Sequence, residues 1–173
     1  ENLAKVLLAT GKYEESLFLY REALLIYEKK LGPKDPNTAF SLVGIGNALL
    51  AMGRLEEAEA SFRRYLDIIE STFGPKSQQA AQGLAKLSEV RWRVGDLQEA
   101  ASLQGRALAI FETVLDSDHP DFAGSLNHVA AIHHDRGEAV RALTFARQAV
   151  AAGYPDRGVL LSALYSAMAS DAG

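Results

Sequence analysis

Apolar residues recur at helical spacing along most of the chain. One example runs from residue 55 to residue 69, where the apolar positions are Leu55, Ala58, Phe62, Leu66 and Ile69. Residues three, four and seven positions apart lie on the same side of a helix, so this spacing gives the helix one apolar face. Charged residues occupy much of the remaining surface. The pattern predicts long amphipathic helices, and it predicts no strand.

The helical pattern repeats every 42 residues. The segment that starts "GKYEESLFLYREAL" at Gly11 aligns without gaps with the segments that start at Gly53 and Gly95. The columns identical in all three copies hold, in the first copy, Gly11, Glu15, Leu24, Ile26 and Glu28. A fourth glycine, Gly137, follows at the same spacing. A second apolar helix precedes each glycine, in a column formed by Leu3, Ile45, Leu87 and Val129. The sequence therefore predicts four repeats of two helices each.

Each repeat is predicted to fold as a helical hairpin. The repeated glycine lies where the first helix must end and the chain must reverse, a position that favours a residue able to adopt positive φ. Near the start of the second helix, one column holds only small residues, namely Ser16, Ala58, Ala100 and Ala142. These would let the two helices approach closely. A single hairpin cannot bury both of its faces, so neighbouring hairpins must stack.

This arrangement resembles the tetratricopeptide repeat, whose second helix carries a series of aromatic and small residues. The first copy fits that series with Tyr13, Ser16, Tyr20 and Ala23, and the second fits it loosely with Leu55, Ala58, Phe62 and Tyr65. The usual period is about 34 residues. The longer period here, with "ALLIYEKKLGPKDP" and "ALAIFETVLDSDHP", is similar to the kinesin-light-chain type. The resemblance covers residues 1 to about 153 and implies an all-α fold, a right-handed α-solenoid of stacked antiparallel helical hairpins.

The repeats divide the chain into five segments. These are 1–35, 36–77, 78–119, 120–155 and a C-terminal capping helix and tail at 156–173. The first copy lacks the opening turn of its first helix, so we expect the chain to be a piece of a longer protein. The fourth copy has a short second helix that stops at "AAGYP". The apolar residues predicted to cover the last hairpin are Val159, Leu160, Leu164, Tyr165 and Met168.

Composition narrows the classes of function. The chain has 173 residues, 48% of them hydrophobic, a net charge of −4 and no cysteine. This describes a folded domain with neither disulfides nor thiolate chemistry. The acidic balance argues against a nucleic-acid surface, and the apolar runs are too short to span a membrane. We expect no cofactor. With no export signal, a cytoplasmic location is the default expectation.

The stretch "LDSDHPDF" at residues 115–122 has the composition of a metal or acid–base site. In the repeat register, however, it is the linker between two hairpins. Its column holds Asp35, Ser77 and His119, each just before a predicted helix. Aspartate and serine there would cap that helix, whereas His119 would be a poorer cap, for which Asp118 or Asp121 would compensate through the helix dipole. A calcium loop is the alternative, but the alternating oxygen ligands that it needs are missing.

Three histidines lie on one predicted helix, His128, His133 and His134. No pair of them that includes His128 shares a helix face, as the zinc-binding spacing of four residues would require. His133 falls in the column of Leu7 and Leu49, which indicates a packing position. No Ser–His–Asp arrangement or phosphate-binding loop is identifiable. The sequence therefore predicts no catalytic or metal site and no enzyme activity.

The family resemblance implies a concave groove, lined by the first helices, that holds a protein or peptide. Carried over column by column, the groove positions are Lys5, Phe40, Val43, Asn47, Gln82, Lys86, Glu89, Arg93, Asn127, His128, Ala131 and His134. Each of these residues is either a ligand contact or plain solvated surface. Trp92 either packs between first helices, which we favour, or presents an aromatic anchor.

Three functions remain open. The leading prediction is a non-catalytic scaffold that binds a protein or peptide in the groove. The second is a regulatory or sensor region of a larger multidomain enzyme, such as a caspase-like peptidase or a nucleotide-switch protein, and the sequence beyond Gly173 would decide it. The third is a self-assembly module that uses an uncovered terminal hairpin, which a monomeric mass in light scattering would exclude.

The register itself can be tested by truncating its apolar columns. Replacing Leu66 or Leu108 by alanine should lower the free energy of unfolding by about 2–5 kcal/mol, since each fills a column between hairpins. Replacing His119 should cost far less. Urea denaturation of the three variants measures the difference, and equal losses at His119 and Leu108 would show that the register is wrong.

Overall fold

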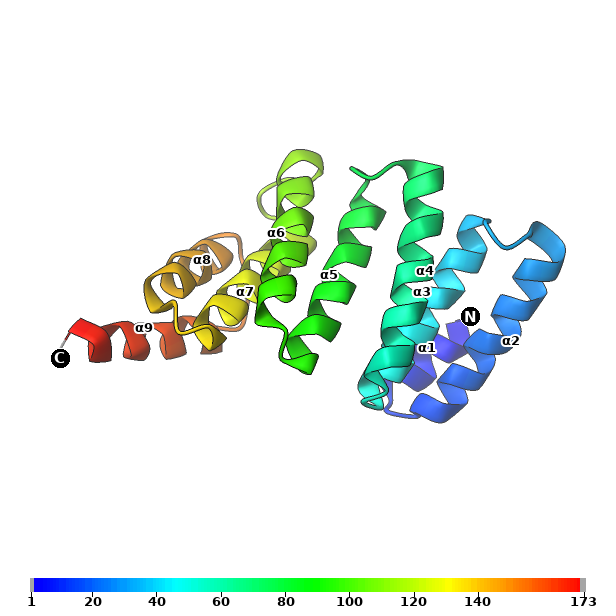
Figure 1. Ribbon diagram of the computed structural model, residues 1–173, viewed down its shortest axis with the longest axis horizontal. Helices are drawn as coiled ribbons and strands as arrows, with labels where there is room; N and C mark the ends of the chain where they lie inside the picture. The colour runs from blue at the N-terminus through cyan, green and yellow to red at the C-terminus, as the bar shows by residue number, and fades with distance from the viewer. Residues whose placement is uncertain (1, 172–173) are drawn as a thin grey trace.

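The computed structural model describes residues 2–171, and the side chains of all these except residues 165 and 168–171. Helices account for most of the described chain, and no strand occurs in it. In order they are α1 (Asn2–Ala9), α2 (Tyr13–Leu31), α3 (Pro36–Ala51), α4 (Leu55–Phe73), α5 (Gln78–Val94), α6 (Leu97–Val114), α7 (Pro120–Asp135), α8 (Ala139–Ala151) and α9 (Gly158–Asp171). The helices stack in chain order along the long axis of the molecule (Figure 1). The predicted all-α solenoid is confirmed.

The four repeated glycines form the turns inside the hairpins. Gly11, Gly53, Gly95 and Gly137 have φ angles of 79°, 75°, 90° and 76°. This left-handed conformation costs glycine little because it has no Cβ atom. The amide that follows each glycine donates to a carbonyl five residues earlier, as Lys12 does to Leu7 at 2.9 Å and Arg54 does to Leu49 at 2.9 Å. The prediction of a positive φ at these turns is confirmed.

The column of small residues lies where the two helices of each hairpin cross. Ser16, Ala58, Ala100 and Ala142 are all fully buried. Where a hydroxyl occurs at the crossing, it bonds across to the other helix. Ser16 Oγ donates to the carbonyl of Ala4 at 2.8 Å, and Ser88 Oγ donates to that of Ala100 at 2.8 Å. A larger side chain would separate the helix axes and break these contacts.

Aromatic residues of the second helices fill the space between hairpins. The ring of Tyr20 lies against the backbone of α3 at Gly44 in the next hairpin, whereas the ring of Phe62 lies against Gly46 of its own hairpin. Tyr65 packs near Gly83 of α5, and its hydroxyl donates to the carbonyl of Gln79 at 3.0 Å. Burial raises the pKa of the Tyr65 phenol to about 12, because the phenolate would lose its hydration. The rings of Tyr20 and Tyr65 therefore join their hairpins to the next one, and the ring of Phe62 packs within its hairpin.

The first helices of the internal hairpins begin at Pro36, Gln78 and Pro120. Asp35 accepts a hydrogen bond from the amide of Asn37 at 2.8 Å, and Ser77 accepts one from Ala80 at 3.2 Å, as predicted for caps. The expectation for the third position was wrong. His119 caps α7 itself, because its Nδ1 accepts from the amide of Asp121 at 3.1 Å. The division of the chain into repeats at these residues stays a prediction.

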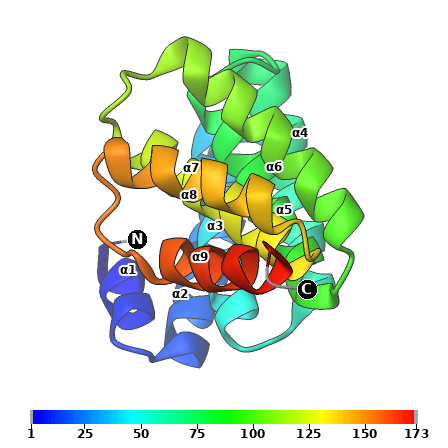
Figure 2. The same cartoon turned by 90° about the vertical axis from the view of Figure 1, so that its left-hand side faces the viewer.

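The two ends of the array differ. At the C-terminal end, α8 has only 13 residues against 19 in α2, and α9 lies beside it (Figure 2). Ala163 of α9 is fully buried, and Val159, Leu160 and Leu164 are half-buried, whereas the predicted capping side chains of Tyr165 and Met168 lie outside the described residues.

At the N-terminal end, an apolar face of the first hairpin is uncovered. Leu3 is 62% exposed and Val6 is 58% exposed, while the residues one repeat later, Ile45 and Ala48, are 5% and 0% exposed. The preceding hairpin accounts for the burial of the later pair. Within the described part of the chain, no helix is both long enough and apolar enough to cross a membrane.

Two helical glycines provide a matched test of the packing between hairpins. A Cβ atom on Gly44 would overlap the buried ring of Tyr20, whereas a Cβ atom on Gly105 would meet no atom within 4 Å. Replacing Gly44 by alanine should lower the free energy of unfolding by about 1–3 kcal/mol. Replacing Gly105 should raise it by up to about 1 kcal/mol through helix propensity. Denaturant unfolding of both variants checks this, and a stabilising Gly44→Ala change would contradict the packing.

Candidate functional site

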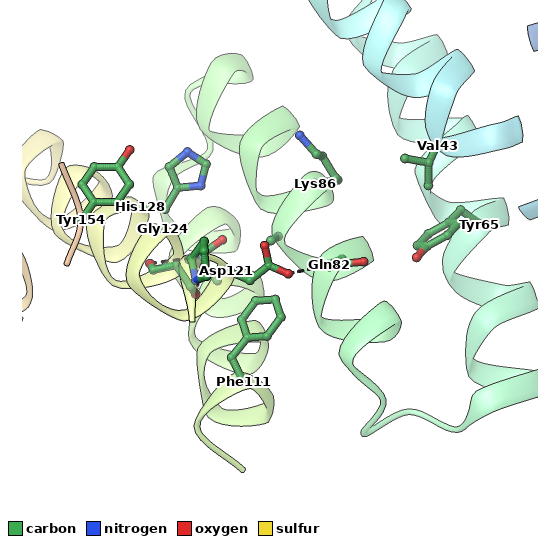
Figure 3. A pocket seen from close by; sticks show the side chains of 13 residues that line it. Val43, Tyr65, Gln82, Lys86, Phe111, Asp121, Gly124, His128 and Tyr154 are labelled. Carbon is green, nitrogen blue, oxygen red and sulfur yellow. Dashed lines mark hydrogen bonds between the residues drawn. The ribbon is translucent and has the colours of Figure 1, made fainter. Parts of the chain in front are cut away.

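A groove of about 460 Å³ opens on the side of the stack where α3, α5 and α7 lie in sequence (Figure 3). Its apolar walls come from Val43 on α3, Tyr65 on α4, Phe111 on α6 and Tyr154 in the segment before α9. Its polar groups come from α5 and α7 and are Gln82, Lys86, Asp121 and His128. Four of the residues predicted to line a groove, Val43, Gln82, Lys86 and His128, are thus brought together.

Asp121 links the two first helices that flank the groove. Its Oδ2 accepts hydrogen bonds from Gln82 Nε2 at 2.8 Å and from Gln78 Nε2 at 3.3 Å, both on α5. The sequence indicated Asp121 only as a charge near the helix dipole. Its contact with Gln82 spans 39 residues of chain and joins two repeats. Asp121 is therefore both a structural link and a negative charge at the groove.

A short row of ion pairs runs along α5. Lys86 Nζ lies 3.2 Å from Glu89, and Arg93 Nη2 lies 3.6 Å from the same carboxylate. Arg93 Nη1 also donates to the carbonyl of Leu50 at 3.2 Å, which ties α5 to the end of α3. Three of the predicted groove residues, Lys86, Glu89 and Arg93, thus satisfy one another.

His128 lies between the groove and Trp92. Its ring makes an edge contact with the Trp92 indole, with 5.7 Å between centroids and 72° between planes. Burial lowers the pKa of His128, an effect that the nearby charge of Glu89 opposes and that of Lys86 reinforces. Trp92 Nε1 donates to Asp135 Oδ2 at 2.7 Å, so the indole spans from α5 to α7. Trp92 therefore packs between first helices, as favoured, and it also lines a second cleft.

That cleft, of about 220 Å³, lies between α5, α7 and α9. Trp92, Ala131 and His134 form part of its wall, together with Val159 and Ser162 of α9. His134 Nε2 lies 2.8 Å from Ser162 Oγ, so this predicted groove residue contacts α9. Ala131 is only 8% exposed, and it offers a ligand little surface.

The other predicted groove residues line neither hollow. Lys5 and Phe40 are exposed, and Asn47 and Asn127 are half-buried. His133 packs, as its column indicated, with its ring stacked on Phe145 at 5.6 Å and its Nδ1 at 2.8 Å from Glu138. In the part of the chain that the structure describes, no three His, Asp or Glu side chains are grouped to hold a metal ion.

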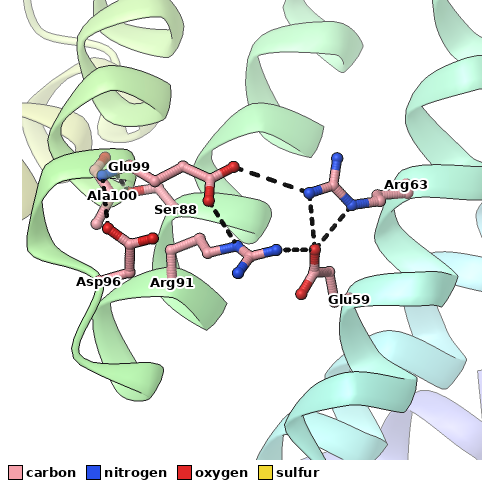
Figure 4. Close-up of polar contacts among 7 residues, drawn as sticks. All are labelled: Glu59, Arg63, Ser88, Arg91, Asp96, Glu99 and Ala100. Carbon is pink, nitrogen blue, oxygen red and sulfur yellow. Dashed lines mark hydrogen bonds and ion pairs between the residues drawn. The ribbon is translucent and has the colours of Figure 1, made fainter.

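A second polar cluster lies away from the groove and joins three helices (Figure 4). Glu59 of α4 pairs with Arg63 at 2.7 Å and with Arg91 of α5. Arg91 Nε also lies 3.0 Å from Glu99 of α6. Glu59, Arg91 and Glu99 are partly buried and Arg63 is exposed, and their opposite charges pair across the boundary between two hairpins. The cluster has a structural explanation.

Gln104 is the groove residue that the repeat pattern could have indicated. It replaces the aromatic residue of the column that holds Tyr20 and Phe62, and it is fully buried. Its Nε2 donates to Ser125 Oγ at 2.9 Å, which connects α6 to α7 beside the groove. Tyr65, Phe111 and Tyr154 were not predicted to line the groove, because they come from outside the first helices.

The comparisons with known proteins agree with the repeat structure. The family model described as the tetratricopeptide repeat matches residues 1–71 and 77–153. The chain belongs to the tetratricopeptide repeat family. Tetratricopeptide repeats are generally protein-interaction scaffolds that bind proteins or peptides, and such proteins are typically non-catalytic.

Solved structures share the fold of this tetratricopeptide chain. It is similar to a kinesin-light-chain-like protein of Podosopora anserina with nearly identical TPR-like repeats, at 22% identity and a TM-score of 0.77, over 95% of this chain and 80% of that one. It is also similar to BtubC (BKLC) from P. vanneervenii, at 19% identity and a TM-score of 0.78, over 95% of this chain and 67% of that one. No curated protein sequence shows significant similarity to it.

The position of His128 predicts a pH dependence. Its unfolded-state pKa is near 6.5 and its folded-state pKa is lower, so the unfolded chain binds the proton more readily. The free energy of unfolding should therefore fall as the pH drops below about 6.5, toward the folded-state pKa. His128→Gln should remove this part of the dependence. NMR titration measures the folded-state pKa, which Glu89→Gln should lower further. A folded-state pKa above 6.5 would contradict the burial of the ring.

Proposed function

We propose that this chain is a non-catalytic scaffold that binds a segment of a partner protein in the groove between α3, α5 and α7. The observation that carries the proposal is the composition of the groove, which combines aromatic and aliphatic walls with amide, carboxylate and imidazole groups. Ligand sites in proteins commonly have this character, with apolar area for affinity and a few polar groups for orientation. An extended or helical segment fits an elongated surface formed by parallel first helices.

The groove residues divide into two groups under this proposal. Val43, Gln82, Lys86 and His128 would contact the ligand directly, since they line the groove. Phe40 and Asn47 on α3 and Asn127 on α7 would contact a ligand that extends beyond it. The roles of regulatory region in a larger enzyme and of self-assembly module stay predictions.

Two helical glycines provide a variant that blocks the groove and a control variant that does not. Gly124 lines the groove, and a Cβ atom on it would meet only Tyr154, at 3.9 Å. Gly124→Trp should fill the groove and reduce capture of a partner by more than about tenfold, since bound side chains and the indole would overlap. The measurement is affinity capture from a native lysate on the immobilised protein, with quantitative mass spectrometry of what is retained.

The matched control is Gly105→Trp on α6, where an added Cβ atom would meet no neighbour within 4 Å. This variant should retain the same proteins as the unchanged chain. Thermal unfolding of both variants verifies that neither loses its fold. Equal retention by Gly124→Trp and Gly105→Trp of every captured protein would refute binding in the groove.

A further inference from the structure

The repeat pattern is broken at the floor of the groove. Gln104 occupies the column that holds an aromatic ring in the first two repeats, Tyr20 and Phe62. Its side chain is fully buried and lines the groove, and its Nε2 is bound to Ser125. Its Oε1 is buried and, among the described residues, has no hydrogen-bond partner. A buried amide oxygen without a donor is costly, so this oxygen is an acceptor in need of a donor.

The groove has a net negative charge, because its lysine is already paired with a glutamate of the same helix while its aspartate has no cationic partner in the described part of the chain. Lys86 and Asp121 are the charged residues that line it. Lys86 is compensated by Glu89 at 3.2 Å, whereas Asp121 is bound only by the neutral amides of Gln78 and Gln82 within the described chain. Both amides donate to Oδ2, which leaves Oδ1 as a second acceptor. Because burial lowers the pKa of His128, its imidazole is neutral near neutral pH and adds no positive charge to the groove.

We propose that the groove binds an arginine side chain of the partner, with its guanidinium between the Asp121 carboxylate and the Gln104 amide oxygen. This deepens the proposed function and rests on it. A guanidinium carries five N–H donors and no acceptor, which complements a groove whose spare groups are acceptors. It is also planar and stacks on aromatic rings, and Tyr154, a half-buried aromatic residue of the lining, offers such a ring.

Other side chains match the groove less well. A carboxylate would meet the charge of Asp121 and would bring no donor for either oxygen. An aromatic or aliphatic side chain would fill the space, but it would leave Asp121 desolvated and Gln104 still without a donor. A lysine ammonium would pair with Asp121, but it is a compact charge with three donors and lacks the planar fork of five donors that a guanidinium has. Arginine combines the positive charge with the largest number of donors.

The test compares two pentapeptides that differ by one charge, acetyl-Ala-Ala-Arg-Ala-Ala-amide and the same peptide with citrulline in place of arginine. Citrulline has nearly the shape of arginine and is neutral. NMR titration of the unchanged, isotopically labelled protein should show the arginine peptide shifting the Gln104 side-chain amide and the Asp121 backbone amide. The citrulline peptide should bind at least about tenfold more weakly, because charge-assisted hydrogen bonds are the strong ones.

Variants of the protein assign the effect to these residues. Asp121→Asn removes the charge and keeps an acceptor, and it should weaken the arginine peptide by at least about tenfold. Gln104→Leu keeps the volume and removes the acceptor, and it should also weaken binding. Asp118→Asn, in the neighbouring linker and outside the groove lining, is the matched control and should have no effect.

Any of three results would overturn the inference: no shift with the arginine peptide, equal binding of the citrulline peptide, or unchanged affinity in Asp121→Asn. The first two use the unchanged protein, so a variant that fails to fold does not affect them. If Gly124→Trp abolishes partner capture while the two peptides bind equally, the groove is a binding site and the arginine assignment is wrong. If Gly124→Trp captures as well as Gly105→Trp does, the proposed function itself fails.

Discussion

The close approach of two helices at a column of small residues determines the rest of this structure. With Ser16, Ala58, Ala100 and Ala142 at the crossings, each hairpin is thin, and each of its two broad faces remains apolar. Neither face can be covered from within the hairpin, so each hairpin packs on the next, and the rings of Tyr20 and Tyr65 enter the space between hairpins, against the backbone at Gly44 and Gly83. The alignment of first helices along one side, and hence the groove, follows from that stacking.

Most of the fold could be predicted because it follows from a pattern repeated every 42 residues. Each hairpin repeats the same local physics, so an assignment in one copy is supported by the others. The cap at His119 was misjudged for a definite reason. An imidazole is a weak cap when treated as a donor, but the neutral ring offers a nitrogen lone pair, and Nδ1 uses it to accept the amide of Asp121. A ranking of residue types by capping strength does not include the tautomer of a histidine, which decides whether Nδ1 can accept a hydrogen bond.

The groove could be predicted only in part, and its least predictable features are the contacts between repeats. Val43, Gln82, Lys86 and His128 lie on first helices, where the family resemblance placed them. The bond from Gln82 to Asp121 depends on side-chain rotamers 39 residues apart, and no periodic pattern encodes it. Gln104, by contrast, can be singled out from the repeat pattern. It departs from its column, and departures from a regular pattern tend to occur where stability alone does not determine the residue. In a repeat protein, the positions that depart from the repeat therefore distinguish its binding site from those of other repeat proteins.

Trp92 gives this architecture an optical consequence. It is the only tryptophan in the chain, and its indole is bound to Asp135 on α7 and lies against the ring of His128, which lines the groove. Indole emission depends on the polarity around the ring and on nearby groups that quench it. The tryptophan emission of this chain therefore comes from one place, the contact between α5 and α7. A change in the spacing of these two helices, or in the protonation of His128, alters the emission without any added label.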